Sequence, residues 1–196
     1  MKDVNVLISN GVDVQTSLEL FGDMAMYDQT LVDFIECVGE KLQKIKNFKE
    51  TTDMPNYAIE VHSLKSDARY LGFTKLAELA YNHEMQSKAN DVNYVYENYD
   101  ALMAEASRII GVANAYLGNS NAVIPEVATP VTLEVKDKTI LVVDDSDIIR
   151  NFVNKIFSST YEVIHAKDGK EAMDILATDS SKIVAMLLDL NMPNVD

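Results

Sequence analysis

Apolar residues recur at helical spacing through the first 117 residues of the chain. Intervals of three and four residues place side chains on one face of a helix, and two long stripes show this pattern. The first stripe consists of Tyr27, Leu31, Phe34, Ile35, Val38, Leu42 and Ile45. The second consists of Val95, Tyr99, Leu102, Ala106, Ile109, Ala113 and Tyr116. Each stripe predicts a long amphipathic helix with one buried face.

Two more helices are expected between these stripes, over residues 55–71 and 74–89. Pro55 suits the first turn of a helix, Gly72 suits a helix end, and Thr74 suits an N-cap. Residues 16–21 predict a short lid helix. Four amphipathic helices joined by short loops predict an antiparallel four-helix bundle whose aromatic and methionine stripes form the core.

From residue 138 the pattern changes to short apolar runs that alternate with helical segments. Strands are expected over residues 139–143, 161–166 and 183–188, and helices from Ser146 to about Phe157 and from Gly169 to Ala177. Near-continuous apolar strands that alternate with helices are typical of a parallel sheet covered on both faces. This part therefore predicts an α/β unit with the order βαβαβ.

The boundary between the two patterns is rich in residues that break helices. Residues 118–130 contain two of the four prolines, Pro125 and Pro130. Prolines favour an extended connection over a fully flexible one. We therefore expect a helical domain over residues 1–117, a linker over 118–137 and an α/β region over 138–196.

Composition narrows the function classes. The 17 basic and 31 acidic residues give a net charge of -14, which disfavours binding to nucleic acid or to anionic lipid. Cys37 is the single cysteine, so an intrachain disulfide and a cysteine zinc site are excluded, and a reducing cytoplasmic setting is expected. No signal peptide and no apolar run long enough to span a membrane are present.

The stretch from Val61 to Gly72 holds the chemically informative residues of the helical part. On a helix, Val61, Leu64, Ala68 and Leu71 share the core face. A second stripe, which the same geometry turns toward solvent, consists of His62, Lys65, Ser66 and Arg69.

These neighbours have a physical use if His62 carries a phosphoryl group. A neutral imidazole ring nitrogen is a nucleophile at cytoplasmic pH. Lys65 offsets the charge of the phosphoryl group, and the small side chain of Ser66 leaves space for a partner's active site. The alternative is an exposed histidine among ordinary surface charges.

The motif His62-Ser-Leu-Lys65-Ser66, with Gly72 ten positions after the histidine, resembles that of the histidine-containing phosphotransfer (HPt) domain. The resemblance covers about residues 14–117. It implies that His62 is the phosphoacceptor and that Lys65, Ser66, Arg69 and Gly72 support the phosphoryl site. His83 and His165 are expected to be structural, with His83 at a helix surface or boundary, and Cys37 is expected to pack between helices.

Carboxylates follow two of the predicted strands. Asp144 and Asp145 come after the first strand, and Asp189 comes after the third. The carboxyl ends of neighbouring parallel strands meet at one crevice, where crowded carboxylates need a cation such as Mg²⁺. Solvated loop acids are the simpler alternative.

The runs Ile-Leu-Val-Val-Asp144-Asp145-Ser, Ala-Lys-Asp168-Gly169 and Leu-Leu-Asp189-Leu-Asn-Met-Pro resemble the receiver domain of response regulators. The resemblance implies a flavodoxin-like fold with Asp189 as phosphoacceptor. It also implies a Mg²⁺ site formed by Asp144, Asp145, Asp189 and the backbone carbonyl of Asn191.

A receiver has five βα units, whereas this chain supplies about two and a half. In receiver topology the third strand would be an exposed apolar edge, so we expect the sequence to be a fragment of a longer protein whose receiver half is marginally folded. The later Ser/Thr and Lys of a complete receiver have no counterpart here.

The first functional hypothesis is a phosphorelay protein without a kinase domain, in which His62 exchanges phosphate with the aspartates of receiver domains and a sensor histidine kinase supplies it. Ile59, Tyr70 and Phe73 would form an apolar docking patch, or Ile59 and Tyr70 would pack under the lid helix. The second hypothesis is the regulatory N-terminal part of a signalling enzyme, for example a diguanylate cyclase. The third is a helical scaffold that is not phosphorylated.

Overall fold

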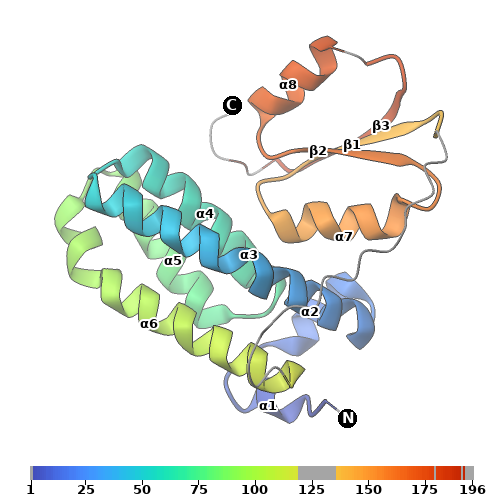
Figure 1. Cartoon of the computed structure of the whole chain (residues 1–196). Coiled ribbons are helices and arrows are strands. Elements are labelled where there is room, and N and C mark those ends of the chain that lie inside the picture. The colour runs from blue at the N-terminus through green and yellow to red at the C-terminus, as the bar shows by residue number, and fades with distance from the viewer. Residues whose placement is uncertain (1, 119–135, 179, 191, 193–196) are drawn as a thin grey trace. The chain divides into compact units, whose positions relative to one another are not determined.

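The computed structural model of the chain describes residues 2–118, 136–178, 180–190 and 192. The chain divides into two compact units, Met1–Gly118 and Asn119–Asp196, each of which is described by itself (Figure 1). Most of the linker expected over residues 118–137 lies outside the described residues. In the described ranges, no helix combines the length and apolar character that crossing a membrane requires.

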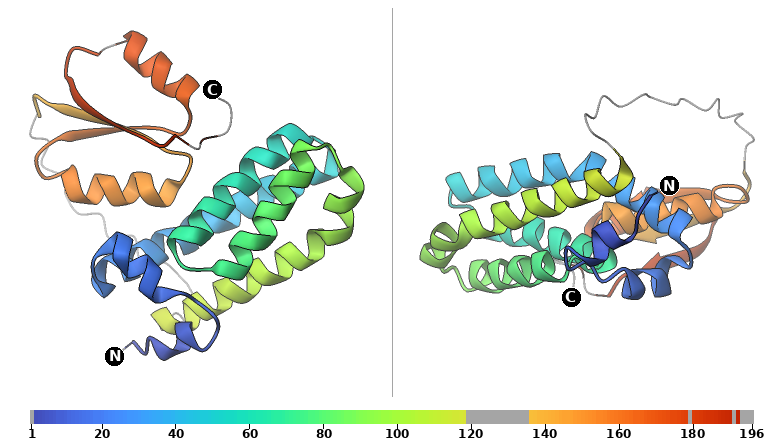
Figure 2. Two further views of the ribbon diagram at one scale, coloured as in Figure 1. Left: turned by 180° about the vertical axis from the view of Figure 1, so that it is seen from behind. Right: turned by 90° about the horizontal axis from the view of Figure 1, so that it is seen from below.

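The first unit is entirely helical, as the spacing of apolar residues predicted. Its long helices α3 (Met24–Glu50), α4 (Met54–Tyr70), α5 (Thr74–Lys88) and α6 (Val92–Leu117) pack in a closed arrangement. Helix α3 contacts α4 and α6, and α5 contacts the same two helices from the other side (Figure 2). Two short helices precede them: α1 (Asn5–Ile8) packs on α6, and α2 (Val14–Phe21) packs on α3 and α4. The sequence predicted α2 two residues shorter and did not predict α1.

Aspartate side chains begin most of these helices. Asp13, Asp23, Asp53 and Asp91 each accept a hydrogen bond from a backbone N–H in the first turn that follows. Such bonds satisfy donors that the helix itself leaves unpaired. The predicted N-cap role of Thr74 is wrong, because Phe73 occupies that position without a side-chain cap. Phe73 packs in the core at 5.3 Å between ring centroids from Phe34, so packing fixes the start of α5.

Most residues of both predicted stripes lie in the core of the helical unit, and Ile35, Leu42 and Tyr99 are partly exposed. Residues Tyr27, Leu31, Phe34, Val38 and Ile45 of α3 are buried, as are Val95, Leu102, Ala106, Ile109, Ala113 and Tyr116 of α6. Helix α4 adds the predicted core residues Val61, Leu64 and Ala68, and Leu71 follows at its C-cap. One face of α4 therefore packs in the apolar core, and its other faces are available for polar contacts.

The turn between α4 and α5 is tied to the segment before α2. Gly72 has φ +73°, and a Cβ atom at this position would lie 2.2 Å from the carbonyl oxygen of Asp13. The backbone N–H of Asp13 donates to the carbonyl of Gly72 at 2.8 Å. Gly72 therefore ends α4, as predicted, and also permits the close approach of the N-terminal segment.

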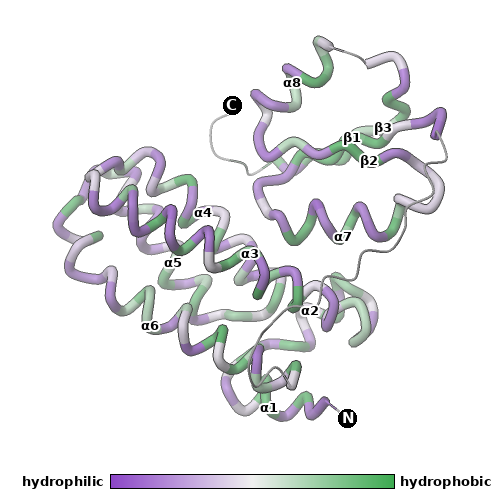
Figure 3. The backbone as a smooth tube through the Cα atoms, in the orientation of Figure 1, coloured by the Kyte–Doolittle hydropathy of each residue, from purple (hydrophilic) through white to green (hydrophobic). Residues whose placement is uncertain are grey.

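The second unit is a three-stranded parallel sheet with one helix on each face. Strands β1 (Thr139–Val143), β2 (Glu162–Ala166) and β3 (Ile183–Leu188) have the order β2-β1-β3. Helix α7 (Asp147–Phe157) covers the face that contains Ile140 and Val142, and α8 (Gly169–Thr178) covers the face that contains Leu141 and Val143. This is the predicted βαβαβ unit, and the hydropathy colouring of Figure 3 shows apolar stretches in its sheet, which belong to β1 and β3.

Strand β3 forms one edge of this sheet, as the sequence led us to expect. Its residues Val184, Met186, Leu187 and Leu188 are exposed, whereas every residue of the central strand β1 is buried. The apolar run of β3 therefore resembles a central strand in composition although it has a neighbour only on its β1 side among the described residues.

Candidate functional site

His62 lies on α4 and faces α5. Its Nδ1 atom is 2.7 Å from Oε1 of Glu84 on α5. The expectation that the ring points to solvent is wrong, since His62 is 6% exposed. Helix α5 packs along this side of α4 and brings Glu84 to the ring, a contact that the periodicity of α4 alone does not reveal.

Glu84 is the centre of a charged network that joins α4 and α5. Its Oε1 atom also accepts a hydrogen bond from Lys88 Nζ at 2.6 Å, and its Oε2 atom accepts one from Lys65 Nζ at 2.7 Å. Lys65 Nζ lies 3.0 Å from His62 Nδ1. Sequence reasoning found Lys65 but missed Glu84 and Lys88, because the partners of a helix on a neighbouring helix leave no local spacing signal.

The charge of Glu84 favours one tautomer of His62. Burial alone would raise the pKa of Glu84, but hydrogen bonds from His62, Lys65 and Lys88 outweigh burial and lower it far below its ordinary value. An ionised carboxylate only accepts hydrogen bonds, whereas the Lys65 ammonium only donates them. Nδ1 is closer to Glu84, at 2.7 Å, than to Lys65, at 3.0 Å, and this favours a proton on Nδ1 that is donated to Glu84. In the neutral ring the lone pair is then on Nε2, which is the nucleophilic nitrogen.

The other residues of the predicted stripe have separate positions. Ser66 is half-buried and Arg69 is exposed. Arg69 and Gly72 line a cleft of about 500 Å³ next to α2, together with Thr16 and Tyr81. The stripe therefore divides into Lys65, which contacts the ring, and Arg69, which lies beside this cleft.

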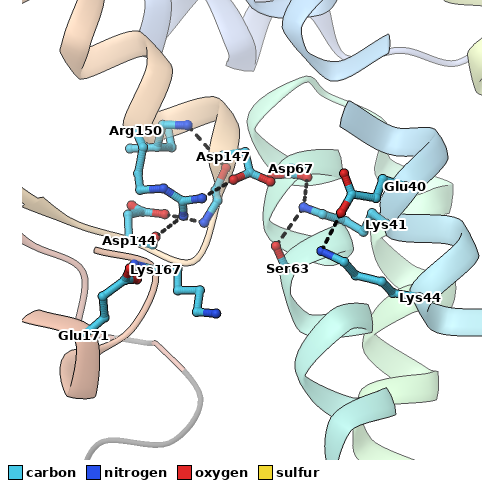
Figure 4. Close-up of polar contacts among 12 residues, drawn as sticks. Glu40, Lys41, Lys44, Ser63, Asp67, Asp144, Asp147, Arg150, Lys167 and Glu171 are labelled. Atoms are coloured by element: carbon cyan, nitrogen blue, oxygen red, sulfur yellow. Dashed lines mark hydrogen bonds and ion pairs between the residues drawn. The ribbon is translucent and has the colours of Figure 1, made fainter. Parts of the chain in front are cut away.

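Another polar cluster fixes α4 against α3. Lys41 of α3 donates to Ser63 Oγ at 2.7 Å and forms an ion pair with Asp67 (Figure 4). Ser63 follows His62 directly in the sequence. A buried ion pair with a hydrogen-bonded hydroxyl favours one rotational setting of α4, and so it helps to aim His62 at α5.

Two further expectations for the helical unit are wrong. His83 was expected at a helix surface or boundary, but it is fully buried, with Nδ1 2.8 Å from the hydroxyl of Tyr57. Burial lowers the pKa of His83, so the neutral ring is favoured.

Phe73 is buried at 1% exposure and does not belong to a surface docking patch, whereas Ile59 and Tyr70 are partly exposed. Cys37 is also partly exposed, and His165 lies within β2.

The three predicted aspartates of the second unit lie together. Asp144 and Asp145 follow β1, and Asp189 follows β3. The N–H of Asp189 donates to the carbonyl of Val143 at 2.9 Å, which continues the pairing of the two parallel strands. One carboxylate oxygen of each aspartate lies within 4.8 Å of those of the other two.

The surroundings of Asp144 show the electrostatic cost of this clustering. Burial, followed by the charges of Asp145 and Asp189, raises the pKa of Asp144 to about 7, against the lowering effect of a backbone hydrogen bond from Ser146. The Ser146 N–H donates to Asp144 Oδ1 at 2.8 Å. The guanidinium of Arg150 on α7 donates to the backbone carbonyl of Asp144 and to the side chain of Asp147 (Figure 4).

The donor set of this cluster fits Mg²⁺. Clustered carboxylate oxygens are hard ligands, and a divalent cation would relieve the repulsion from Asp145 and Asp189 that adds to burial in raising the pKa of Asp144. Asn191, whose backbone carbonyl was expected to contribute, lies outside the described residues.

The helical bundle holds a histidine against a carboxylate, and the parallel sheet that follows it in the sequence has clustered aspartates at its strand ends. Residues 29–111 match the family model of the Hpt domain, and residues 140–196 match that of the response regulator receiver domain. The chain therefore contains an Hpt domain followed by a receiver domain region. No curated protein and no solved structure matches the chain significantly. Both kinds of domain are phosphoryl carriers, and their combination implies phosphorelay signalling.

Proposed function

We propose that His62 is the phosphoryl carrier of the Hpt domain and that it exchanges the group with aspartates of receiver domains. The observation that carries this proposal is the 2.7 Å contact between His62 Nδ1 and Glu84. It holds the proton on Nδ1 and leaves the lone pair on Nε2. A histidine with only a general surface role needs no such partner.

In the accepting step, the Nε2 lone pair attacks the phosphorus of an aspartyl phosphate on a partner receiver. The bond between phosphorus and the carboxylate oxygen breaks, and the electron pair leaves with the carboxylate. Nδ1 keeps its proton, and the positive charge that the ring acquires is offset by ionised Glu84. No proton has to be transferred in this step.

In the donating step, a carboxylate oxygen of a receiver aspartate attacks the phosphorus, and the bond between phosphorus and Nε2 breaks. Within this chain, Asp189 is the proposed acceptor, and Asp144 and Asp145 would hold Mg²⁺ beside it. The cation would supply neutralisation of the charge on the transferring group. The role of Asp189 is to present its carboxylate at the end of β3, where the strand pairing with β1 fixes its backbone.

We further propose that a sensor histidine kinase supplies the phosphoryl group, which reaches this chain by way of a phosphorylated receiver. The basic side chains around His62 fit such a partner, because the active edge of a receiver is acidic. Lys65 and Lys88 together exceed the charge of Glu84 by one, and the half-exposed Lys88 presents this positive charge next to the ring.

The test uses the whole chain and a phosphorylated receiver as donor, followed by ³¹P NMR of the product. We expect one phosphoramidate signal from N-phosphorylated His62, which His62→Gln removes. His165→Gln is the matched control, because it removes a histidine of the other unit and should retain the signal. A signal that persists in His62→Gln, or that His165→Gln abolishes, would refute the assignment.

A further inference from the structure

Two lysines bind the same carboxylate next to His62, but they differ in exposure. The side chain of Lys65 is 9% exposed and that of Lys88 is 49% exposed, whereas Glu84 between them is 4% exposed. Lys88 approaches from the same helix as Glu84, four residues later, and Lys65 approaches from α4.

This difference decides which lysine can leave Glu84. When one partner of an ion pair is well exposed, the pair changes an equilibrium constant by at most about five-fold. Separation of a buried ion pair changes the equilibrium constant by about 100-fold or more. Lys65 is also 3.0 Å from Nδ1, so its ammonium group lies at the ring edge that does not carry the phosphoryl group. Lys65 is therefore committed to holding Glu84 and His62 in place.

We propose that Lys88, and not Lys65, is the cation that contacts the phosphoryl group on His62. The inference rests on the function proposed above. When Nε2 becomes phosphorylated, the ammonium group of Lys88 leaves Oε1 of Glu84 and donates hydrogen bonds to the phosphoryl oxygens. Glu84 keeps its bonds to Nδ1 and to Lys65. No covalent bond other than the one between Nε2 and phosphorus forms, and no proton changes place.

Charge balance within the cluster supports this assignment. Before phosphorylation, ionised Glu84 is paired with two ammonium groups, so the cluster has one cation more than its carboxylate needs. A phosphoryl group brings a charge of about -1.5 to -2 at neutral pH. The surplus cation is the half-exposed one, which has the freedom to follow the new charge.

The experiment phosphorylates the whole chain at His62 with phosphoramidate, a chemical donor that needs no partner protein. The ionisation of the phosphoryl group is then titrated by ³¹P NMR in the wild type and in Lys88→Gln, Lys88→Arg and Lys65→Gln. Lys75→Gln is the matched control, because Lys75 is another lysine of α5 with an exposed side chain, paired with Glu105 at 3.2 Å. Nitrogen-15 NMR of unphosphorylated His62 reports the tautomer in each variant.

We expect Lys88→Gln to increase the proton affinity of the phosphoryl group about five-fold and to leave the tautomer of His62 unchanged. Lys88→Arg should restore the wild-type titration, and Lys75→Gln should match the wild type. Lys65→Gln should alter the tautomer signal instead.

A wild-type titration in Lys88→Gln, together with a five-fold effect in Lys65→Gln, would overturn the assignment while leaving His62 as carrier. Failure of the wild type to accept phosphate at His62 from phosphoramidate and from receivers would instead refute the proposed function, and this inference with it.

Discussion

The imidazole Nδ1 of His62 lies 2.7 Å from a carboxylate oxygen of Glu84, although the two residues are 22 positions apart and lie on different helices. Glu84 also accepts hydrogen bonds from Lys65 and Lys88. One buried carboxylate therefore positions the imidazole ring, favours its tautomer and holds both neighbouring ammonium groups. The site is therefore a property of the α4–α5 pair.

Removal of the Glu84 carboxylate should slow phosphorylation of His62. A hydrogen bond to a charged group contributes about 1.5–3 kcal/mol, so Glu84→Ala should reduce the rate about 10- to 100-fold. Glu84→Gln keeps an acceptor oxygen and should lose less. Single-turnover transfer from a phosphorylated receiver measures both rates. Equal rates in Glu84→Ala and the wild type would show that Glu84 does not position the ring.

The buried ring of His83 should make the stability of the helical unit depend on pH. Burial lowers its pKa from the ordinary value of 6.5, so the unfolded chain binds the proton more readily than the folded one. The contribution of neutral His83 is complete above pH 6.5 and is lost as the pH falls through the lower folded-state value.

Urea unfolding at pH 7.5 and pH 5.5, in the wild type and in His83→Phe, tests this linkage. Tyr57, whose hydroxyl lies 2.8 Å from Nδ1, stays in both proteins. We expect the loss of unfolding free energy on acidification to be smaller in His83→Phe. The same loss in both proteins would assign the pH dependence to other groups.

Gly72 should be far less tolerant of a side chain than Gly118. Both have positive φ, +73° and +78°, but a Cβ at Gly72 would lie 2.2 Å from Asp13 backbone whereas Gly118 has nothing within 4 Å. Gly118→Ala should cost about 1 kcal/mol of unfolding free energy from backbone strain alone, and Gly72→Ala should cost more. Thermal unfolding of the two variants compares them directly, and equal costs would contradict the close contact of Asp13 with the turn.

Divalent cations should bind the second unit through its aspartate cluster. Asp144, Asp145 and Asp189 bring their carboxylate oxygens within 4.8 Å of one another. Asp145→Asn and Asp189→Asn should each weaken Mg²⁺ binding measured by calorimetry, whereas Asp174→Asn on the exposed side of α8 should not. Unchanged Mg²⁺ binding in the cluster variants would show that these aspartates do not bind the cation.

The elements that sequence reasoning found best are those with strong periodicity. The strands Thr139–Val143 and Ile183–Leu188 have their predicted bounds, and most residues of both long stripes are in the core. The aspartate cluster was also predictable, because parallel strand ends meet at one edge of a sheet. In these cases local pattern and topology are sufficient.

The contacts between helices were not predictable in the same way. Periodicity shows which face of α4 is apolar, but not which helix covers its polar face, so His62 was wrongly turned to solvent and Glu84 was missed. His83 was misjudged for the same reason, because its burial depends on Tyr57 of α4 and Tyr94 of α6.

The most direct test of the phosphorelay account measures phosphate transfer to this chain from phosphorylated receivers in the wild type, His62→Gln and Asp189→Asn. The stability of the product in acid and in alkali identifies the bond formed. The account predicts an acid-labile, alkali-stable phosphate that is absent only in His62→Gln. If none of several receivers labels His62 in the wild type, the account is contradicted and the helical unit is a scaffold.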